Sequence, residues 1–222
     1  MLKQLRKLVC VANRRLPRLE LDKFTCGCVS GIERKRGLVV IKPSDVPSKE
    51  VLPDDLMVID LTGKIVEGSG KLPQETLTHL HLYDAFPHIE SIAHTHSIWA
   101  TICAQAGLSI PAFGTTHLEF FKGDIPCTRT LTDEEINSGF EAAVGSVIAE
   151  TFADSDYMAI PGVLVKNHIP FTWGESPLLA VHNATMLETI AKMAYRTVTV
   201  SMLAGKEATL VPKALVEGWG KW

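Results

Sequence analysis

The sequence predicts an α/β fold: one domain, residues 1–222, with a central, mainly antiparallel β-sheet flanked by helices. Strand-like and helix-like segments are mixed without the regular alternation that builds a parallel sheet. Polar turns join neighbouring strand-like runs, as in hairpins. Hydrophobic residues make up 46% of the 222 residues, enough to bury a sizeable core. No internal repeat or low-complexity linker divides the chain, which favours a single domain.

The first segment has the periodicity of an amphipathic helix. Its apolar residues recur at intervals of three and four, so they share one face. They are Leu2, Leu5, Val9, Ala12 and Leu16. Basic residues lie between them and are expected on the outer face: Lys3, Arg6, Lys7 and Arg14. The simplest interpretation of this basic run is a solvated helix face.

Four short apolar runs in the first third of the chain are typical of strands. Polar or glycine-containing turns separate them in pairs. The expected strands are residues 24–32, 37–41, 56–60 and 64–67. Residues 42–55, rich in Pro, Ser and Asp, form the expected loop between the two pairs.

Capping residues mark the helices in the rest of the chain. Pro73 is well placed to begin one, and Thr132 with Glu135 three residues later forms a capping box. Ser176 and Pro177 begin the last. The expected helices are residues 73–86, 97–106, 131–151 and 177–203, and the expected strands are 89–94 and 157–166, the second interrupted at residues 161–162.

Composition excludes several functional classes. The net charge of −3, from 22 basic and 25 acidic residues, gives no general field for nucleic acid. No stretch approaches the ~18 apolar residues of a membrane helix. The five cysteines show no Cys-x-x-Cys spacing, so reduced thiols in a cytoplasmic protein are expected.

The strongest local motif is a His-x-His pair. His94 and His96 follow an apolar strand, where residues two apart point to the same side. Their imidazoles suit zinc or another transition metal. His168 follows the apolar run 163–165 and is a candidate third ligand. Three histidines leave a coordination position open, which is typical of catalytic zinc.

A carboxylate could complete this ligand set or act as a base. Glu75 and Glu119 are the candidates, because each lies near an expected element boundary. The remaining histidines are assigned to less specific places: His79, His81 and His182 to core-edge or surface positions on helices, and His88 and His117 to loops.

Beyond these residues, most of the chain resembles the class II aldolase/adducin family, and within it the L-ribulose-5-phosphate 4-epimerases. The resemblance includes the His-x-His segment and extends on both sides of it. The matching segments are residues 25–30, 40–44, 94–97, 110–117, 123–129 and 161–165. It is weakest after residue 205.

The resemblance implies a nine-stranded, mainly antiparallel sheet. It also implies a four-fold symmetric homotetramer, with active sites between neighbouring subunits. The family's zinc ligands match His94, His96 and His168. Glu75 stands where the epimerase has an aspartate ligand and where sister aldolases have a glutamate acid/base. Glu119 matches the epimerase's other catalytic carboxylate, also an aspartate. Zinc is the expected cofactor, with manganese or another divalent metal as alternatives.

The family's phosphate-binding residues match only in part. Gly27, Lys42 and Ser44 agree with the family pattern. The departures are Cys28 for asparagine, Asp45 for glycine, and Pro73-Gln74 for a serine pair. The epimerase's C-terminal tyrosine, an acid/base, has no evident counterpart among residues 218–222, and tryptophan cannot exchange a proton in that way.

The resemblance therefore implies a small-molecule sugar phosphate as substrate. The expected activity is metal-dependent interconversion of L-ribulose 5-phosphate and D-xylulose 5-phosphate, by retro-aldol and aldol steps, in pentose metabolism. A second hypothesis is a zinc-dependent class II aldolase, acting on a sugar phosphate, as fuculose-phosphate aldolase does, or on a non-phosphorylated sugar acid. Glu75 and the altered phosphate pocket favour it. A third is a non-catalytic, adducin-like interaction module, against which the three intact histidines count.

Overall fold

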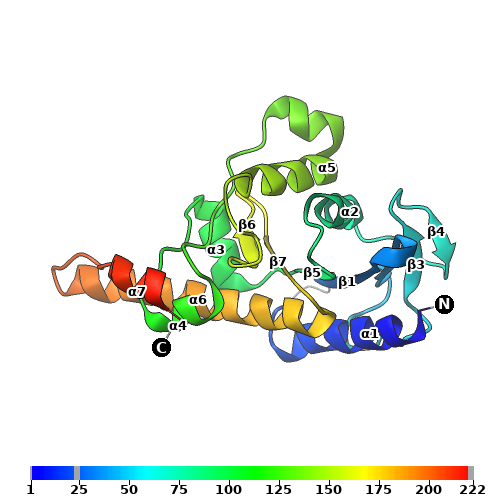
Figure 1. Ribbon diagram of the computed structural model, residues 1–222, viewed down its shortest axis with the longest axis horizontal. Coiled ribbons are helices and arrows are strands. Elements are labelled where there is room, and N and C mark those ends of the chain that lie inside the picture. The colour runs from blue at the N-terminus through cyan, green and yellow to red at the C-terminus, as the bar shows by residue number, and fades with distance from the viewer. Residues whose placement is uncertain (1, 23–25, 220–222) are drawn as a thin grey trace.

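A seven-stranded antiparallel sheet forms the centre of the molecule (Figure 1). The computed structural model describes residues 2–22 and 26–219. The strand order is β4-β3-β2-β1-β5-β7-β6. The strands are β1 Cys28–Glu33, β2 Leu38–Ile41, β3 Met57–Asp60, β4 Ile65–Glu67, β5 Ser91–His94, β6 Gly162–Leu164 and β7 Pro170–Gly174. Neighbouring strands all pair antiparallel, so the predicted fold class is confirmed.

Helices cover both faces of the sheet. In Figure 1, α1 and α6 run along one face, and α2 and α5 lie on the other. The helices are α1 Lys3–Arg18, α2 Thr76–Ala85, α3 Ile98–Ala106, α4 Thr115–Phe120, α5 Asp133–Thr151, α6 Pro177–Leu203 and α7 Lys213–Gly218, with one 3-10 turn at Arg34–Arg36. In the described chain, no helix combines the length and apolar character that crossing a bilayer requires.

The alternation of strand residues places the chemistry on the α2 side of the sheet. Ile92 packs in the core beneath α2 and α5, whereas its neighbour Ala93 packs against α1 and α6. Because alternate residues of a strand share a face, His94 points toward α2. On β1, Ser30 lies between two residues of the same α2-side cluster, so its hydroxyl also faces α2.

Helix α1 is fixed to the sheet by polar contacts as well as by its apolar face. The buried amide of Asn13 donates to the carbonyl of Val29 at 2.8 Å and accepts the same residue's N–H at 2.9 Å. Contrary to the expectation above, Arg6 does not lie on the outer face of the helix. Its side chain is buried, donates to the carbonyls of Pro53 and Leu56, and pairs with Glu67 at 3.0 Å. The helix therefore has a buried polar anchor at its amino end.

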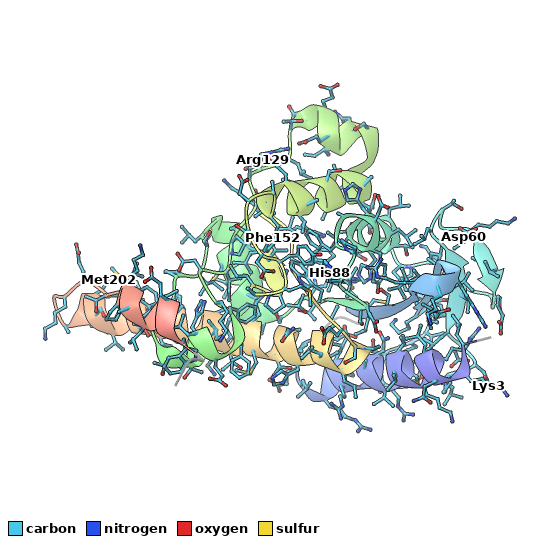
Figure 2. All side chains as sticks on the ribbon, in the orientation of Figure 1. Lys3, Asp60, His88, Arg129, Phe152 and Met202 are labelled. Atoms are coloured by element: carbon cyan, nitrogen blue, oxygen red, sulfur yellow. The ribbon has the colours of Figure 1, made fainter. Side chains whose placement is uncertain are left out.

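Helix α5 was expected to be one long helix and is kinked instead. Gly139 has φ 150°, a value that favours glycine, and divides α5 into two segments. The predicted capping box at its start is present, with the Thr132 side chain accepting the Glu135 N–H. Arg129, labelled in Figure 2, bonds to Glu135 and Glu150 on the two segments and ties them together.

Several elements differ from the expectations, among them helix α7, which was not predicted. Only Gly162–Leu164 of the expected strand 157–166 is extended, because Asp156 caps a turn whose N–H donors come from Met158 and Ala159. Strand β7 and the short helix α4 were not predicted. In the first strand, residues 24 and 25 lie outside the described residues, and β1 begins at Cys28.

The sheet has seven strands in the described chain rather than the nine implied by the resemblance. Two isolated bridges lie outside these strands. Ile110 pairs antiparallel with Ile125, and Cys127 pairs parallel with Leu164 of β6. Residues 110–127 therefore continue the sheet's β6 edge by single bridges, too short to form strands.

Candidate metal and substrate site

His94 ends strand β5 and is fully buried. Its Nε2 lies 3.0 Å from the carbonyl of Cys26, to which it donates, and 3.4 Å from a carboxylate oxygen of Glu75. Glu75 occupies the N-cap position of α2, and its side chain is 13% exposed. The pairing of Cys28 with His94 brings the start of β1 alongside this contact. Two of the sequence-predicted ligands therefore meet at the amino end of α2.

His96 and His168 lie in the same neighbourhood. Within the described residues, Nε2 of His96 is buried and has no hydrogen-bond partner. His168 follows Asn167, whose φ of 62° turns the chain between β6 and β7. Its ring packs edge-on against Phe140. Both His96 and Glu75 are close enough to act on the pKa of His168.

Burial keeps the imidazoles of His94 and His168 neutral. Desolvation lowers the pKa of His168 to about 4, and the nearby carboxylate of Glu75 only partly opposes the shift. Desolvation likewise lowers the pKa of His94, again against the effect of Glu75. A neutral imidazole is the form that binds a metal ion, because its free lone pair is the ligand.

The four residues fit a divalent metal in kind, although their side chains are not gathered into a complete ligand set. Across residues 2–22 and 26–219, no three His, Cys, Asp or Glu side chains converge as a metal site would require. Nε2 of His94 is instead hydrogen-bonded to Cys26. The donor types nevertheless suit zinc, and the unpartnered, buried Nε2 of His96 lacks the partner that a metal would supply.

His79 is buried in the core, contrary to its expected place at the core edge. Its Nε2 lies 2.8 Å from Nδ1 of His94, and its Nδ1 lies 2.7 Å from Oγ of Ser30. That hydroxyl in turn lies 2.7 Å from Oη of Tyr83. Burial lowers the pKa of His79 well below its usual value. The sequence contains one signal for this contact, since residues four apart on a helix share a face, and His79 follows Glu75 by four.

A cavity of about 520 Å³ opens beside Glu75. The three sequence-predicted phosphate residues, Gly27, Lys42 and Ser44, all line it. Lys42 is buried, and its ammonium donates to the carbonyls of Pro43 at 3.0 Å and Val46 at 2.9 Å. An ammonium held by neutral carbonyls is well placed to receive an anion, because an anion would compensate its lost hydration.

The departures from the family's phosphate pattern have local roles. Cys28 is buried, and desolvation raises the pKa of its thiol to about 11, so it stays neutral. Asp45 is exposed and accepts the Lys71 N–H at 3.3 Å, a hydrogen bond in which Lys42 takes no part. Sequence reasoning did not identify Asp22, a buried carboxylate that accepts the Gly27 N–H at 3.2 Å and the Ser48 hydroxyl at 2.7 Å.

Glu119 lies apart from the histidines. It is exposed on α4, which in Figure 1 is next to α7 and distant from α2. The indole N–H of Trp219, just after α7, donates to its carboxylate at 3.3 Å. Of residues 218–222, which contain no evident counterpart of the family's tyrosine, residues 220–222 lie outside the described residues. Trp219 is thus the tail residue that contacts Glu119 in the described chain.

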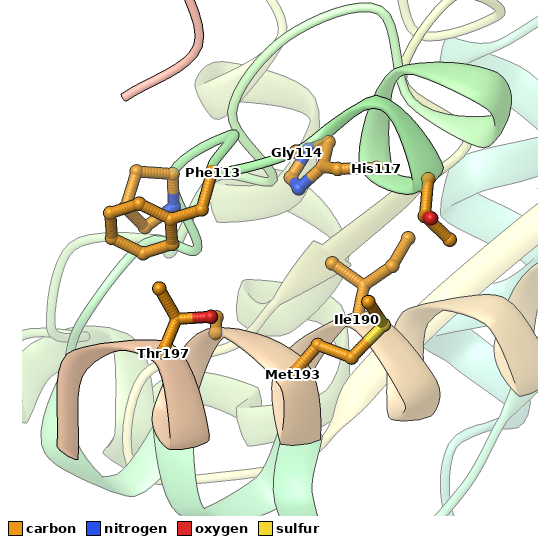
Figure 3. A pocket seen from close by; sticks show the side chains of 9 residues that line it. Phe113, Gly114, His117, Ile190, Met193 and Thr197 are labelled. Atoms are coloured by element: carbon orange, nitrogen blue, oxygen red, sulfur yellow. The ribbon is translucent and has the colours of Figure 1, made fainter. Parts of the chain in front are cut away.

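A second, smaller cavity of about 240 Å³ lies between α6 and the segment before α4 (Figure 3). Ile190 and Met193 face it from α6, and Phe113 faces it from the other side. His117 also lines it but is buried on α4, not in a loop, and its Nε2 donates to the carbonyl of Gly123 at 2.7 Å. None of the candidate site residues lines this cavity.

Comparisons with known proteins concern the family and the fold of the chain. The family model described as the class II aldolase and adducin N-terminal domain matches residues 7–195. L-fuculose 1-phosphate aldolase superposes with a TM-score of 0.78 at 22% identity, covering 96% of this chain and 93% of that one. YgbL from Escherichia coli, whose activity is given only provisionally as aldolase/epimerase/decarboxylase, has a TM-score of 0.73 at 21% identity and covers 97% of both chains. L-fuculose-1-phosphate aldolase from Thermus thermophilus has a TM-score of 0.70 at 19% identity, covering 92% of this chain and 99% of that one. At these identities the structural likeness concerns the fold.

Proposed function

Because the chain belongs to the class II aldolase and adducin family, we propose that it catalyses metal-dependent, reversible aldol cleavage of a ketose phosphate. The first activity to test is L-ribulose-5-phosphate 4-epimerase. One observation supports the proposal most directly: the cavity lined by Lys42 and Ser44 is also lined by Glu75, which contacts His94. The residues proposed to bind an anion and the residues proposed to bind a metal therefore meet at one side of this cavity.

The residues have distinct roles in this proposal. His94, His96 and His168 bind the ion, and Glu75 either completes the set or takes a proton from the substrate. A divalent ion held there would supply a Lewis acid that polarises the ketose carbonyl. Lys42 binds the phosphate, with the Ser44 hydroxyl and the backbone of Gly27 beside it. The substrate thus lies with its carbonyl at the end of β5 and its phosphate just after the end of β2.

Glu119 would take and return the proton of the hydroxyl at the cleaved carbon. A single chain does not bring Glu119 to the histidines, because α4 lies apart from α2. We infer that a second copy of the chain supplies it, in a homotetramer with active sites at subunit interfaces. Co-assembly of a Glu119→Gln chain with a His96→Ala chain should restore activity that neither has alone. Continued inactivity of the mixed oligomer would contradict a shared site.

An aldolase is the second candidate, and Trp219 favours it. An epimerase must return a proton after the aldehyde fragment has turned over, and the indole N–H that contacts Glu119 cannot exchange a proton at neutral pH. The two activities share the same bond cleavage between C3 and C4. They differ in whether the aldehyde is retained and rejoined or released.

One assay separates these activities. The zinc-loaded protein is incubated with L-ribulose 5-phosphate, and D-xylulose 5-phosphate and glycolaldehyde phosphate are measured separately. Xylulose 5-phosphate as the main product supports the epimerase, and free glycolaldehyde phosphate supports the aldolase. Stoichiometric zinc without either product indicates a different ketose or a sugar acid. A chain that binds no stoichiometric metal would favour the non-catalytic interaction module.

A further inference from the structure

A line of buried polar groups lies behind His94, between the sheet and α2. It runs from Nδ1 of His94 to Nε2 of His79 (2.8 Å), from Nδ1 of His79 to Oγ of Ser30 (2.7 Å), and from there to Oη of Tyr83 (2.7 Å). The exposed fraction is 0% for the first three residues and 1% for Tyr83. Because water does not reach them, the direction of each hydrogen bond constrains the next.

Two groups of this line lie on one stripe of α2, with Glu75 at the amino end of the same stripe. Glu75, His79 and Tyr83 are spaced by four residues, so they lie above one another on the helix face that meets β1 and β5. Glu75 contacts Nε2 of His94, while His79 contacts the other nitrogen of the same ring. Side chains of this stripe therefore contact both ring nitrogens of one candidate metal ligand.

The observed contacts fix one direction along the line. The carbonyl of Cys26 can only accept, so Nε2 of His94 carries the proton and Nδ1 accepts. Nε2 of His79 must then donate, and its Nδ1 accepts from the Ser30 hydroxyl. The oxygen of Ser30 accepts from the Tyr83 hydroxyl. Every donor in the line has an acceptor.

Metal binding requires the opposite direction. Nε2 of His94 must then present a lone pair, so its proton resides on Nδ1 and is donated to Nε2 of His79. His79 donates from Nδ1 to Ser30, Ser30 donates to Tyr83, and the Tyr83 O–H proton turns away from Ser30, out of the line. Each imidazole still has one N–H, and the number of protons in the line is unchanged.

We propose that His79, backed by Ser30 and Tyr83, is a positioning residue that fixes the ring orientation and tautomer of His94 and reverses its own tautomer when a divalent ion binds. This inference rests on the proposed metal site. Histidine ligands commonly donate their second N–H to a carbonyl or carboxylate. An imidazole acceptor differs because it must itself be held in one tautomer, and the Ser30 hydroxyl, which can donate or accept, permits both.

Two serines of the same sheet provide a matched test. Ser30 and Ser91 are both fully buried, and the Ser91 hydroxyl bonds to the carbonyl of Ser30 without joining the line. Zinc affinity is measured by competition with a chromophoric chelator. Ser30→Ala should weaken it by roughly 10-fold, the lower end of the range for partners of metal ligands, and Ser91→Ala should leave it unchanged. Tyr83→Phe, which keeps the ring, provides a second measurement if Ser30→Ala folds poorly.

Substitutions of His79 separate positioning from space filling. His79→Gln retains a donor and an acceptor and should keep more zinc affinity than His79→Leu, which retains neither. The absorption spectrum of the cobalt-loaded protein should change in His79→Leu and Ser30→Ala but not in Ser91→Ala.

The tautomers themselves are observable by ¹⁵N NMR of histidine-labelled protein, with the His79 signal assigned by its loss in His79→Gln. The proton of His79 should be on Nε2 without zinc and on Nδ1 with it. The same tautomer in both states, or equal zinc affinity of the two serine variants, would overturn this inference but not the proposed metal site. If the unmodified protein binds no zinc, the proposed metal site is wrong and the inference with it.

Discussion

Replacement of Lys42 by methionine tests the anion-binding end of the cavity. The Lys42 ammonium already donates to two carbonyls, at 3.0 and 2.9 Å, so one of its three N–H groups remains for a phosphate oxygen. One hydrogen bond to a charged group contributes about 1.5–3 kcal/mol. At 1.4 kcal/mol per factor of ten, Lys42→Met should raise KM for a phosphorylated ketose by roughly 10- to 150-fold.

The value of kcat should change little, because the phosphate takes no part in the bond cleavage and is bound equally before and during the reaction. The assay compares L-ribulose 5-phosphate with L-ribulose. Lys49→Met, at an exposed lysine outside the cavity lining, is the control. A thermal melt of each variant tests the fold. An unchanged KM for the phosphorylated ketose, or an equal loss with both ketoses, would refute the assignment of Lys42 to a phosphate.

Three further substitutions test the site and its surroundings. His96→Ala should lower zinc affinity by more than about 100-fold, since losing a ligand exceeds the effect of losing a ligand's partner; equilibrium dialysis that still finds one zinc per chain would show that the ligand set is wrong. Trp219→Phe should lower kcat by roughly 3- to 10-fold, the equivalent of about one hydrogen bond to Glu119. The zinc content should not change. An unaltered kcat would show that Trp219 is not part of the site. Arg129 holds the pKa of Glu135 at about 2 in the folded chain, below its ordinary value. The contribution to stability is therefore present above about pH 4.5 and is lost as the pH falls toward 2. Urea unfolding of Arg129→Gln should show a weaker pH dependence over that interval.

Much of the fold could be predicted because its signals are local. The capping box of α5 and the Ser176 cap of α6 depend on residues three positions apart, and both helices begin where expected. Helix α4 has only six residues, too few for a periodic pattern. Strand β7 begins at a proline, which together with the turn before it resembles the continuation of a loop. It pairs with β6, the short strand just before it, and with β5, which is distant in sequence.

The site shows the same division between local and tertiary information. His94 could be placed because its strand and its spacing from His96 are local features. The buried contacts of His79 were missed because a histidine inside a helix resembles any edge residue until Ser30, on strand β1, is known to face it. Asp22 was missed for a similar reason, since its partners Gly27 and Ser48 become neighbours only through the tertiary fold.

The close packing of Gly27 constrains how the substrate range of this protein can be redesigned. A Cβ at this position would lie 3.3 Å from the carbonyl of His94, so a larger residue would push on the backbone that carries a candidate ligand. Asp45 and Gln74 are exposed and lie outside the strands and helices, so they can vary without that effect. Library design for new substrates should therefore begin at these two positions and leave residue 27 as glycine.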